Sequence, residues 1–560
     1  MHSHVRFAAV LLLFVWVLPA CSSDGGNSID AVTDVSTDTD SSVPLDTVDQ
    51  DNAGDTGTAE TDTTEARTCL GTVEAASTYT LDGLDGPVEI VVDQWGVPHV
   101  FASTERDLFA AQGFIVARYR IVQMHVLRAV TSGRYGEGLL AGPGDVSNDV
   151  YMRVLNLRGV AEQMWEGIQA NEPELVTMLE AYSSGVNQYL AKVASGDIKG
   201  SAEMALLGDI WEWTPVDCLL IGRLQSWDLS FDGRSDKVAN YERYMEHVTR
   251  WQGGPLDGLF EDMHPLQPAT DALSVPGITA DRKSTLRTPA VSMEKKFQID
   301  PQRLQTLQET LQSVPLHAYI TSPREVGSND WTISGALSAT GFAMVANDTH
   351  LSLRNPPVFF EIHLNTTRAG GDLDLAGVTF PGIPSIILGR NAHAAWGGTV
   401  YYADVTDVYL ESYTPGTPAT VELDGAQVAV TQREEVVWYK IPEEGCASWI
   451  GSFINGVKNE VEEVDGKCKL TLHIQEVPHH GPVIPGSQMT TEEGGEAVMT
   501  WKWTGFKPTN ELKTVYKMMR MASPEEFLDA LSYFKVGAQN WVYADQSGHI
   551  AYAAFCQIPV

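Results

Sequence analysis

Residues 327–335, with the sequence GSNDWTISG, decide how the rest of this chain is interpreted. A serine inside a chain has no base of its own, whereas a serine at an N-terminus carries an α-amino group whose pKa is roughly 7.7–8.0. Cleavage between Gly327 and Ser328 would therefore produce a hydroxyl nucleophile and a base in the same residue. Gly-Ser-Asn alone is also a common turn, so the stretch needs support from other parts of the chain.

Further motifs follow this stretch in a fixed order. They are ANDTHL at 346–351, FPG at 380–382, GRN at 389–391, WGGT at 396–399 and QNWVYAD at 539–545. Together with GSNDWTISG, they resemble the penicillin acylase family of N-terminal nucleophile hydrolases over most of the chain, from about Thr72 to Val560. The agreement of several spaced motifs makes this resemblance specific.

The resemblance implies an α+β fold of the N-terminal nucleophile hydrolase type. This fold is a four-layer αββα sandwich in which two antiparallel sheets lie between helical layers, with Ser328 at a strand end between the sheets.

The pattern of residues also indicates a fold that mixes helices and strands. Apolar residues recur at helical spacing from Thr104 to about Gly133, and Thr104 with Asp107 predicts a capping box. Apolar and β-branched runs after Ser328, including 358–365 and 427–433, predict strands.

The resemblance and the changes in composition divide the chain into five parts. We expect a lipoprotein-type signal segment at 1–21, an acidic disordered tether at 22–67, a first-chain (α) segment at 68–265, a spacer that is excised at 266–327, and a second-chain (β) segment at 328–560. A helix is predicted within the spacer at Pro301–Gln312, and an ordinary surface excursion that the mature protein retains is the alternative. Compared with the family, the second segment is expected to be truncated at its C-terminus.

The first 67 residues indicate export. An apolar run at 7–18 is too short to span a membrane, and the following Leu-Pro-Ala-Cys resembles a bacterial lipoprotein cleavage box that ends at Cys21. Cys21 is then lipidated, and the protein is expected in the cell envelope or periplasm, anchored to the outer membrane. Ordinary secretion is the alternative, because Pro19 is unusual in such a box. Residues 22–67 are rich in Asp, Thr, Ser and Gly and are expected to form a flexible tether.

Composition and charge narrow the class of partner. The chain has 560 residues, 43% of them hydrophobic, which is enough for a large core. Its net charge is −36 and no basic stripe is present, so nucleic acid is excluded as a partner. The expected partners are a small-molecule acyl amide, a membrane through the lipid anchor, and the two processed chains of the protein itself as a heterodimer.

Export permits disulfides among the six cysteines. With Cys21 assigned to lipid, five remain. Cys446 and Cys468 flank a strand-like segment with an Asp465-Gly466 turn, so we predict that they pair. An odd number is then left, and at least one thiol is expected to be free or buried.

The resemblance assigns roles to residues around Ser328. Acyl transfer needs a nucleophile, a base and donors for the oxyanion. Ser328 would supply the nucleophile and the base, the backbone N–H of Val400 and the side-chain amide of Asn540 would form the oxyanion hole, and His350 would orient the serine and tune its amine.

The resemblance also suggests a substrate pocket and a metal site. Leu351, Ile387 and Leu388 match the wall of the acyl pocket and are aliphatic, which favours a fatty-acyl amide such as an acyl-homoserine lactone or a lipopeptide. Asp404, the carbonyl of Thr406 and Asp407 match a structural calcium site. Ca²⁺ needs more oxygens than these, Asp236 is a weak further candidate, and a solvated acidic turn explains the aspartates equally well. The chemistry itself needs no cofactor.

Two hypotheses therefore stand. The first is an exported, self-cleaving hydrolase of linear amide bonds that is activated by cleavage at Gly327-Ser328. The second is a catalytically inactive, truncated remnant or surface-tethered binding lipoprotein that keeps the scaffold.

Overall fold

The computed structural model describes residues 77–138, 141–207, 210–229, 301–312, 327–351, 355–401, 403–490 and 494–558. The chain divides into the units Met1–Thr80 and Leu81–Val560, and every element below lies in the second. The predictions for the signal segment at 1–21 with Cys21, for the 22–67 tether and for Asp236 lie outside the described residues. Among the described helices, none combines the length and apolar character needed to cross a bilayer.

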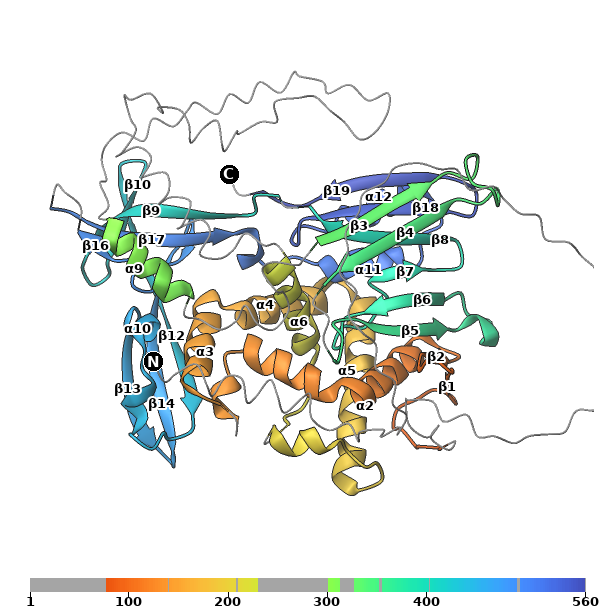
Figure 1. Ribbon diagram of the computed structural model, residues 1–560, viewed down its shortest axis with the longest axis horizontal. Coiled ribbons are helices and arrows are strands. Elements are labelled where there is room, and N and C mark those ends of the chain that lie inside the picture. Colours follow the sequence, from red (N-terminus) through yellow and green to blue (C-terminus); the bar gives the residue numbers. More distant parts are fainter. Residues whose placement is uncertain are drawn as a thin grey trace, which may run out of the picture. The chain divides into compact units, whose positions relative to one another are not determined.

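The first part of the second unit is mainly helical (Figure 1). Its helices are α2 (Glu105–Thr131), α3 (Pro143–Leu155), α4 (Leu157–Asn171), α5 (Pro173–Ser195) and α6 (Pro215–Leu229), with short 3₁₀ turns η1 (Tyr135–Glu137) and η2 (Ala202–Leu206). Helices α2 and α5 pack closely because each has a glycine at the contact. A Cβ added at Gly113 would lie 2.1 Å from the carbonyl oxygen of Tyr182, and one at Gly185 would lie 1.9 Å from that of Ala110. The backbones could not approach this closely with larger residues.

The predicted capping box at the start of α2 is only half correct. The Thr104 hydroxyl accepts a hydrogen bond from the Asp107 backbone N–H at 3.2 Å, as expected for an N-cap. The Asp107 carboxylate, however, accepts from the N–H groups of Asp85 and Gly86. The Asp107 carboxylate therefore binds the turn before β1. In a capping box it would instead accept a hydrogen bond from the Thr104 backbone N–H.

An eight-stranded sheet has the order β1-β2-β5-β6-β7-β8-β18-β19. The strands are β1 (Glu89–Val92), β2 (Pro98–Phe101), β5 (Phe360–Asn365), β6 (Asp374–Thr379), β7 (Leu388–Arg390), β8 (Ala394–Val400), β18 (Gln539–Asp545) and β19 (Ile550–Phe555). The paired strands of this sheet are antiparallel, as predicted, except that β2 and β5 run parallel. A long stretch of chain separates these two strands, so no tight turn imposes an antiparallel direction.

A two-stranded hairpin, β3 (Gly327–Ile333) and β4 (Met344–His350), lies against β8 and β18 (Figure 1). Neighbouring residues of a strand point to opposite faces. Trp541 and Tyr543 of β18 contact Phe534 and Phe527 of the α12 region, whereas Asn540 is on the other face. The described layers are therefore helices, the large sheet and the hairpin, and the predicted α+β class is confirmed.

Two smaller sheets follow in the chain. One has the order β11-β10-β9-β17-β16 and the other β12-β14-β13, with β15 pairing with β14. The strands are β9 (Thr406–Thr414), β10 (Thr420–Leu423), β11 (Ala426–Ala429), β12 (Thr431–Tyr439), β13 (Lys458–Val464), β14 (Lys467–Val477), β15 (Gly481–Pro482), β16 (Met489–Thr490) and β17 (Glu496–Trp503). The single strand predicted at 427–433 is wrong, because Val430 is buried against Val421 and Val477 and separates β11 from β12.

Short helices connect and cover these sheets. They are α9 (Pro301–Gln312), η4 (Thr367–Ala369), η5 (Cys446–Trp449), α10 (Ser452–Asn455), η6 (Thr504–Phe506), α11 (Glu511–Met518) and α12 (Pro524–Leu531). The helix predicted at Pro301–Gln312 is confirmed. It contacts α10 and buries Leu307 and Leu311, so this part of the predicted spacer packs on the second segment.

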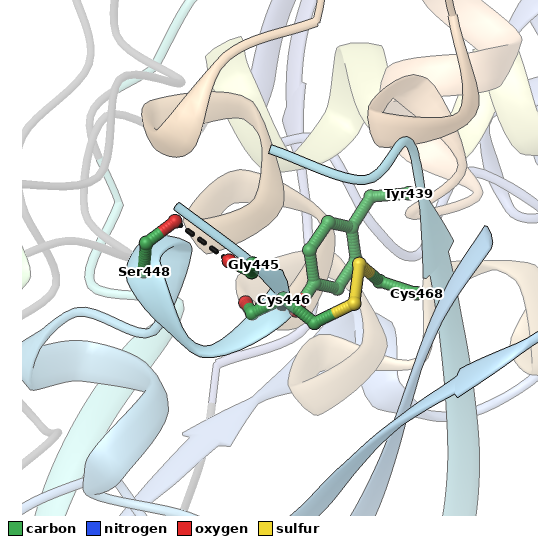
Figure 2. The surroundings of a disulfide bond; sticks show 5 residues. All are labelled: Tyr439, Gly445, Cys446, Ser448 and Cys468. Carbon is green, nitrogen blue, oxygen red and sulfur yellow. Dashed lines mark hydrogen bonds between the residues drawn. A yellow bond between two sulfur atoms is a disulfide. The ribbon is translucent and has the colours of Figure 1, made fainter. Parts of the chain in front are cut away.

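The predicted Cys446–Cys468 disulfide is confirmed and ties η5 to β14 (Figure 2). The Tyr439 ring lies beside it, and its hydroxyl donates to the Cys446 carbonyl oxygen at 2.7 Å. Cys468 is fully buried and pairs with Tyr439 across β12 and β14. Among the described residues, Cys218 and Cys556 are free thiols, in agreement with the cysteine count.

Replacing Cys446 with serine is expected to destabilise the second segment. The bond closes a loop with a sequence separation of 22, and losing a disulfide of this kind costs about 2–4 kcal/mol of unfolding free energy. Urea unfolding followed by tryptophan fluorescence measures the loss. Cys556→Ser is the control, because its thiol is free, and equal midpoints for the two variants would contradict the prediction.

Candidate active site

Ser328 is the second residue of β3 and pairs with Thr349 of β4. Exposure alternates along the hairpin: Ser328 and Asp330 are half-buried, whereas Asn329 and Trp331 are exposed. Asp330 and its partner Asn347 contact residues of β8, so the half-buried face is the one turned toward the large sheet. Ser328 lies on this same face, two residues before Asp330. Its hydroxyl donates to the carbonyl oxygen of Gly327 at 2.5 Å.

His350 lies on the other face of the hairpin, across from Gly327. Its Nδ1 would be 3.4 Å from a Cβ at Gly327, and its Nε2 is 3.3 Å from an Asp348 carboxylate oxygen. Its side chain is 43% exposed. The His350 imidazole therefore lies beside Gly327. Ser328 and its partner Thr349 project from the opposite face of the hairpin, because neighbouring residues of a strand point to opposite faces.

Asn347 attaches the hairpin to β8. Its side-chain amide donates to the Gly398 carbonyl oxygen at 3.0 Å and accepts from the Gly398 N–H at 3.2 Å. Gly397 permits this approach, because a Cβ at that position would lie 2.7 Å from the Asn347 Cβ. Gly397 of the WGGT motif is thus explained by its close packing against β4 of the hairpin.

We expect Gly397→Ala to displace the hairpin and impair both stability and processing. Overpacking of this kind costs about 1–3 kcal/mol. Gly167→Ala is the control, because a Cβ at this helical glycine meets no atom within 4 Å. Thermal unfolding and the fraction of cleaved chain on a denaturing gel are measured together, and a Gly397→Ala protein as stable and as cleaved as Gly167→Ala would refute the close-packing argument.

The Asn540 side chain is held from both ends. Its Oδ1 accepts from the Tyr552 hydroxyl at 2.7 Å, and its Nδ2 donates to Thr399 Oγ1 at 3.1 Å and to the Val400 carbonyl oxygen at 3.2 Å. Asn540 pairs with Thr399 across β18 and β8, so both lie on the face that carries the hairpin. The bond from Tyr552 orients the amide so that its NH₂ group is directed toward β8.

The Val400 N–H is directed away from β18. Tyr401 donates its N–H to the Ala538 carbonyl oxygen at 2.8 Å, and ladder bonds in an antiparallel pair recur at every second residue. On the opposite side, β7 pairs with β8 only as far as Trp396. Val400 thus occupies a strand end whose N–H is not part of the β8–β18 ladder, as an oxyanion donor requires.

Asp330 is a member of this site that sequence reasoning missed. Burial raises the pKa of its carboxyl group, and a hydrogen bond with Thr399 opposes that rise. Asp330 also contributes, after burial and Tyr401, to the raised pKa of the Tyr552 hydroxyl. A strand period of two from Ser328 was the available signal. Thr399 and Tyr552 were detectable only from the pairing of β8, β18 and β19.

The predicted pocket residues are half-buried. Leu351 directly follows β4. The Ile387 carbonyl oxygen accepts from the Trp396 indole N–H at 2.8 Å, and Leu388 Cδ2 would be 3.4 Å from a Cβ at Gly398. Ile387 and Leu388 are thus placed next to the WGGT strand that ends at Val400.

Of the predicted calcium ligands, Asp404 lies between β8 and β9, whereas Thr406 and Asp407 are the first two residues of β9. Asp404 is exposed, Asp407 is half-buried, and Thr406 is fully buried at the start of β9. The Thr406 hydroxyl is a buried polar atom without a hydrogen-bond partner in the described structure. Thr406 and Asp407 are consecutive residues of β9, so this hydroxyl and the Asp407 carboxylate point to opposite faces of the strand. Asp404 and Asp407 could each offer carboxylate oxygens to a cation, although these supply only part of the 6–8 oxygens that Ca²⁺ takes.

A serine on a hairpin above two candidate oxyanion donors of an antiparallel sheet is typical of the N-terminal nucleophile hydrolases. The family model described as penicillin amidase matches residues 87–560, and the chain belongs to this family.

Several characterised proteins are similar to this chain. Acyl-homoserine lactone acylase QuiP of Pseudomonas aeruginosa is 28% identical over 364 residues, covering 64% of this chain and 38% of that protein. A penicillin acylase 2 proenzyme of a Pseudomonas species is 25% identical over 510 residues, covering 86% and 54%. Penicillin G acylase of Escherichia coli is 22% identical over 492 residues, covering 83% and 53%. The chain spans about half the length of the curated relatives it matches, or less.

A solved thermostable penicillin G acylase from Alcaligenes faecalis also matches. It has a TM-score of 0.30 and 23% sequence identity, and the match covers 40% of this chain and 35% of that chain.

Proposed function

We propose that the chain is the precursor of an exported amide hydrolase that cleaves itself at Gly327-Ser328 and then uses Ser328 as an N-terminal nucleophile. The observation that supports this most is the position of Ser328, on the hairpin face turned toward the strands of Val400 and Asn540. Membership of the penicillin amidase family supports the class of reaction.

Processing would begin at the Ser328 hydroxyl, which already contacts the Gly327 carbonyl group. The oxygen adds to the Gly327 carbonyl carbon, the peptide C–N bond breaks, and an ester links Gly327 to the serine oxygen. Water then hydrolyses this ester, leaving a carboxylate on Gly327 and a free hydroxyl and amine on Ser328. His350 lies next to Gly327, and there it is suited to moving a proton to or from the new amine.

Turnover would repeat the same chemistry on a bound amide. The neutral Ser328 amine takes the hydroxyl proton as the oxygen attacks the substrate carbonyl. The oxyanion that forms would accept hydrogen bonds from the Val400 N–H and the Asn540 amide, which are neutral. The Asn540 Nδ2 now donates to Thr399 Oγ1 and to the Val400 carbonyl oxygen, so one of these bonds would be exchanged for the bond to the oxyanion. The amine returns the proton to the leaving nitrogen, and water releases the acyl group from the serine ester.

We propose a fatty-acyl amide as the substrate. The aliphatic side chains of Leu351, Ile387 and Leu388 would accommodate methylene groups, each worth about 0.8 kcal/mol when buried. The relatives include proteins named for acyl-homoserine lactones and proteins named for penicillin. These are the two classes of substrate between which the experiment below decides.

We also propose that Asp404, Thr406 and Asp407 contribute oxygens to a structural Ca²⁺ that would hold the segment between β8 and β9. Cys21 would carry the lipid that anchors the protein to the outer membrane, with the acidic tether between lipid and enzyme and the two cleaved chains held together as a heterodimer.

Purified protein on a denaturing gel tests processing, and N-terminal sequencing tests the cleavage point. Two fragments, the later one beginning at Ser328, are expected. Hydrolysis of homoserine-lactone amides with acyl chains of increasing length should then give kcat/KM values that rise by up to about fourfold per CH₂, the equivalent of ~0.8 kcal/mol. An intact chain without hydrolytic activity would favour the binding lipoprotein, and a preference for phenylacetyl amides would overturn only the substrate assignment.

A further inference from the structure

A second cluster of chemically active side chains lies outside the candidate active site. It consists of Glu411 of β9 and of His479 and His480 in the turn between β14 and β15. Their potential ligand atoms all lie within 4.8 Å of one another. Among the residues that the structure describes, no other group of three or more His, Cys, Asp or Glu side chains brings its potential ligand atoms this close together. We propose that Glu411, His479 and His480 bind a Zn²⁺ ion.

The three side chains converge from two separate segments. Glu411 is 4% exposed, and its two carboxylate oxygens face different imidazoles. Oε1 contacts His480 Nδ1, and Oε2 is 3.8 Å from His479 Nε2. The second distance is too long for a hydrogen bond.

His479 is the member that protein contacts leave unsatisfied. Its Nε2 is buried and has no hydrogen-bond partner within the described structure. Buried polar atoms in native proteins almost always have a partner, and an imidazole nitrogen directed at a carboxylate is a good metal ligand. An ion between His479 and Glu411 would satisfy both groups.

The donor set is the kind that Zn²⁺ prefers. Zn²⁺ binds imidazole nitrogen and carboxylate oxygen at about 2.0–2.2 Å in tetrahedral sites, which places adjacent donors roughly 3.3 Å apart. The His479–Glu411 distance of 3.8 Å needs only a small contraction, and the closer His480–Glu411 pair needs to open. Three protein ligands leave a fourth position for water or an anion.

Neighbouring groups hold the ligands in position. The Thr500 hydroxyl donates to Glu411 Oε1 at 2.9 Å, and the Tyr409 ring stacks on His480 with centroids 3.7 Å apart. Gly481 has φ +142°, and a Cβ there would lie 2.4 Å from the Trp501 carbonyl oxygen. Only glycine allows the histidine turn to lie this close to β17. Such outer contacts orient metal ligands and strengthen binding.

The proposed ion would join β9 to the β14–β15 turn, and thereby connect the five-stranded sheet with the sheet that carries the disulfide. It is a structural site and is independent of the amide chemistry. Binding to the folded state alone would raise the melting temperature, and the rise would grow with the logarithm of the metal concentration once that concentration exceeds Kd. The competing explanation is an ion pair of Glu411 with protonated histidines, which would bind no metal.

Tag-free full-length protein, stripped with EDTA and dialysed against dilute ZnCl₂, should retain about one Zn²⁺ per chain by elemental analysis. Co²⁺ in place of Zn²⁺ should give the visible absorption of a tetrahedral site. His479→Asn should lose the bound metal, whereas His473→Asn, in β14 and outside the cluster, should retain it. Thr500→Val should weaken binding by roughly 10–100-fold.

Circular dichroism checks that each variant is folded. If His479→Asn does not fold, two other measurements test the metal site. They are the cobalt spectrum of the unaltered protein and the weaker metal binding expected of Thr500→Val. The proposal is overturned if the unaltered protein retains no stoichiometric Zn²⁺, or if His473→Asn loses as much metal as His479→Asn. Addition of excess Ca²⁺ should not displace the Zn²⁺, because Ca²⁺ prefers a larger, all-oxygen site.

Discussion

Replacing Ser328 with alanine should leave one uncleaved chain and reduce kcat for amide hydrolysis on the order of 10⁶-fold, the size of effect found when an activated serine nucleophile is removed. Alanine retains the β3 backbone but has no oxygen to attack Gly327 or a substrate. A denaturing gel measures cleavage, and a chromogenic acyl amide measures hydrolysis. The stability of the fold should change little, because Ser328 is only half-buried and its hydroxyl bonds to the adjacent residue.

Ser338→Ala is the matched control. Ser338 lies in the turn between β3 and β4, and its hydroxyl bonds only locally to Thr340. This variant should be cleaved and active like the unaltered protein. Ser328→Cys should regain cleavage because a thiolate is also a nucleophile. Full activity in an uncleaved Ser328→Ala protein would eliminate the N-terminal nucleophile mechanism.

Asn540→Ala is expected to lower kcat by about 10²–10³-fold with a much smaller change in KM, because an oxyanion donor acts mainly on the transition state. The Asn540 amide is already oriented by Tyr552, Thr399 and the Val400 carbonyl oxygen. Steady-state kinetics on a processed enzyme separates the two parameters.

Two further variants define the role of Asn540. Gln539→Ala changes the neighbouring amide, which points to the other face and bonds to the Gly537 carbonyl oxygen, so kcat should remain nearly unchanged. Tyr552→Phe removes the bond that orients Asn540 and should lower kcat by less than Asn540→Ala does. If Asn540→Ala changed KM alone, the amide would be a binding group and not an oxyanion donor.

The sequence predicted some elements of the fold from local patterns alone. The helix from Thr104, the helix at Pro301–Gln312 and the Cys446–Cys468 bond follow from periodicity, capping and turn residues, and the structure confirms them. Local patterns failed at Val430, where burial in a tertiary cluster divides a continuous β-forming run. Local patterns also do not specify the parallel pairing of β2 and β5, which depends on a contact between distant segments.

The candidate site shows the same division between local and tertiary information. Ser328 and Asn540 belong to sequence motifs, and the resemblance that those motifs carry predicted a nucleophile at Ser328 and an amide donor at Asn540. Asp330, Thr399 and Tyr552 join them only through strand pairing. Strand pairing also decides that His350, which is predicted to orient Ser328 and tune its amine, lies across from Gly327 on the opposite face of the hairpin. The Glu411, His479 and His480 cluster likewise joins residues from β9 and from a turn about seventy residues later.

By itself, the sequence determined which residues could do chemistry and which segments would be helix or strand, because these properties depend on side-chain type and on spacing along a few turns or strands. Only the tertiary structure decided which face of the hairpin meets the large sheet, how Asn540 is oriented and which distant carboxylate meets the two histidines. Those outcomes depend on the register and packing of strands from different parts of the chain, and no local pattern of residues specifies them.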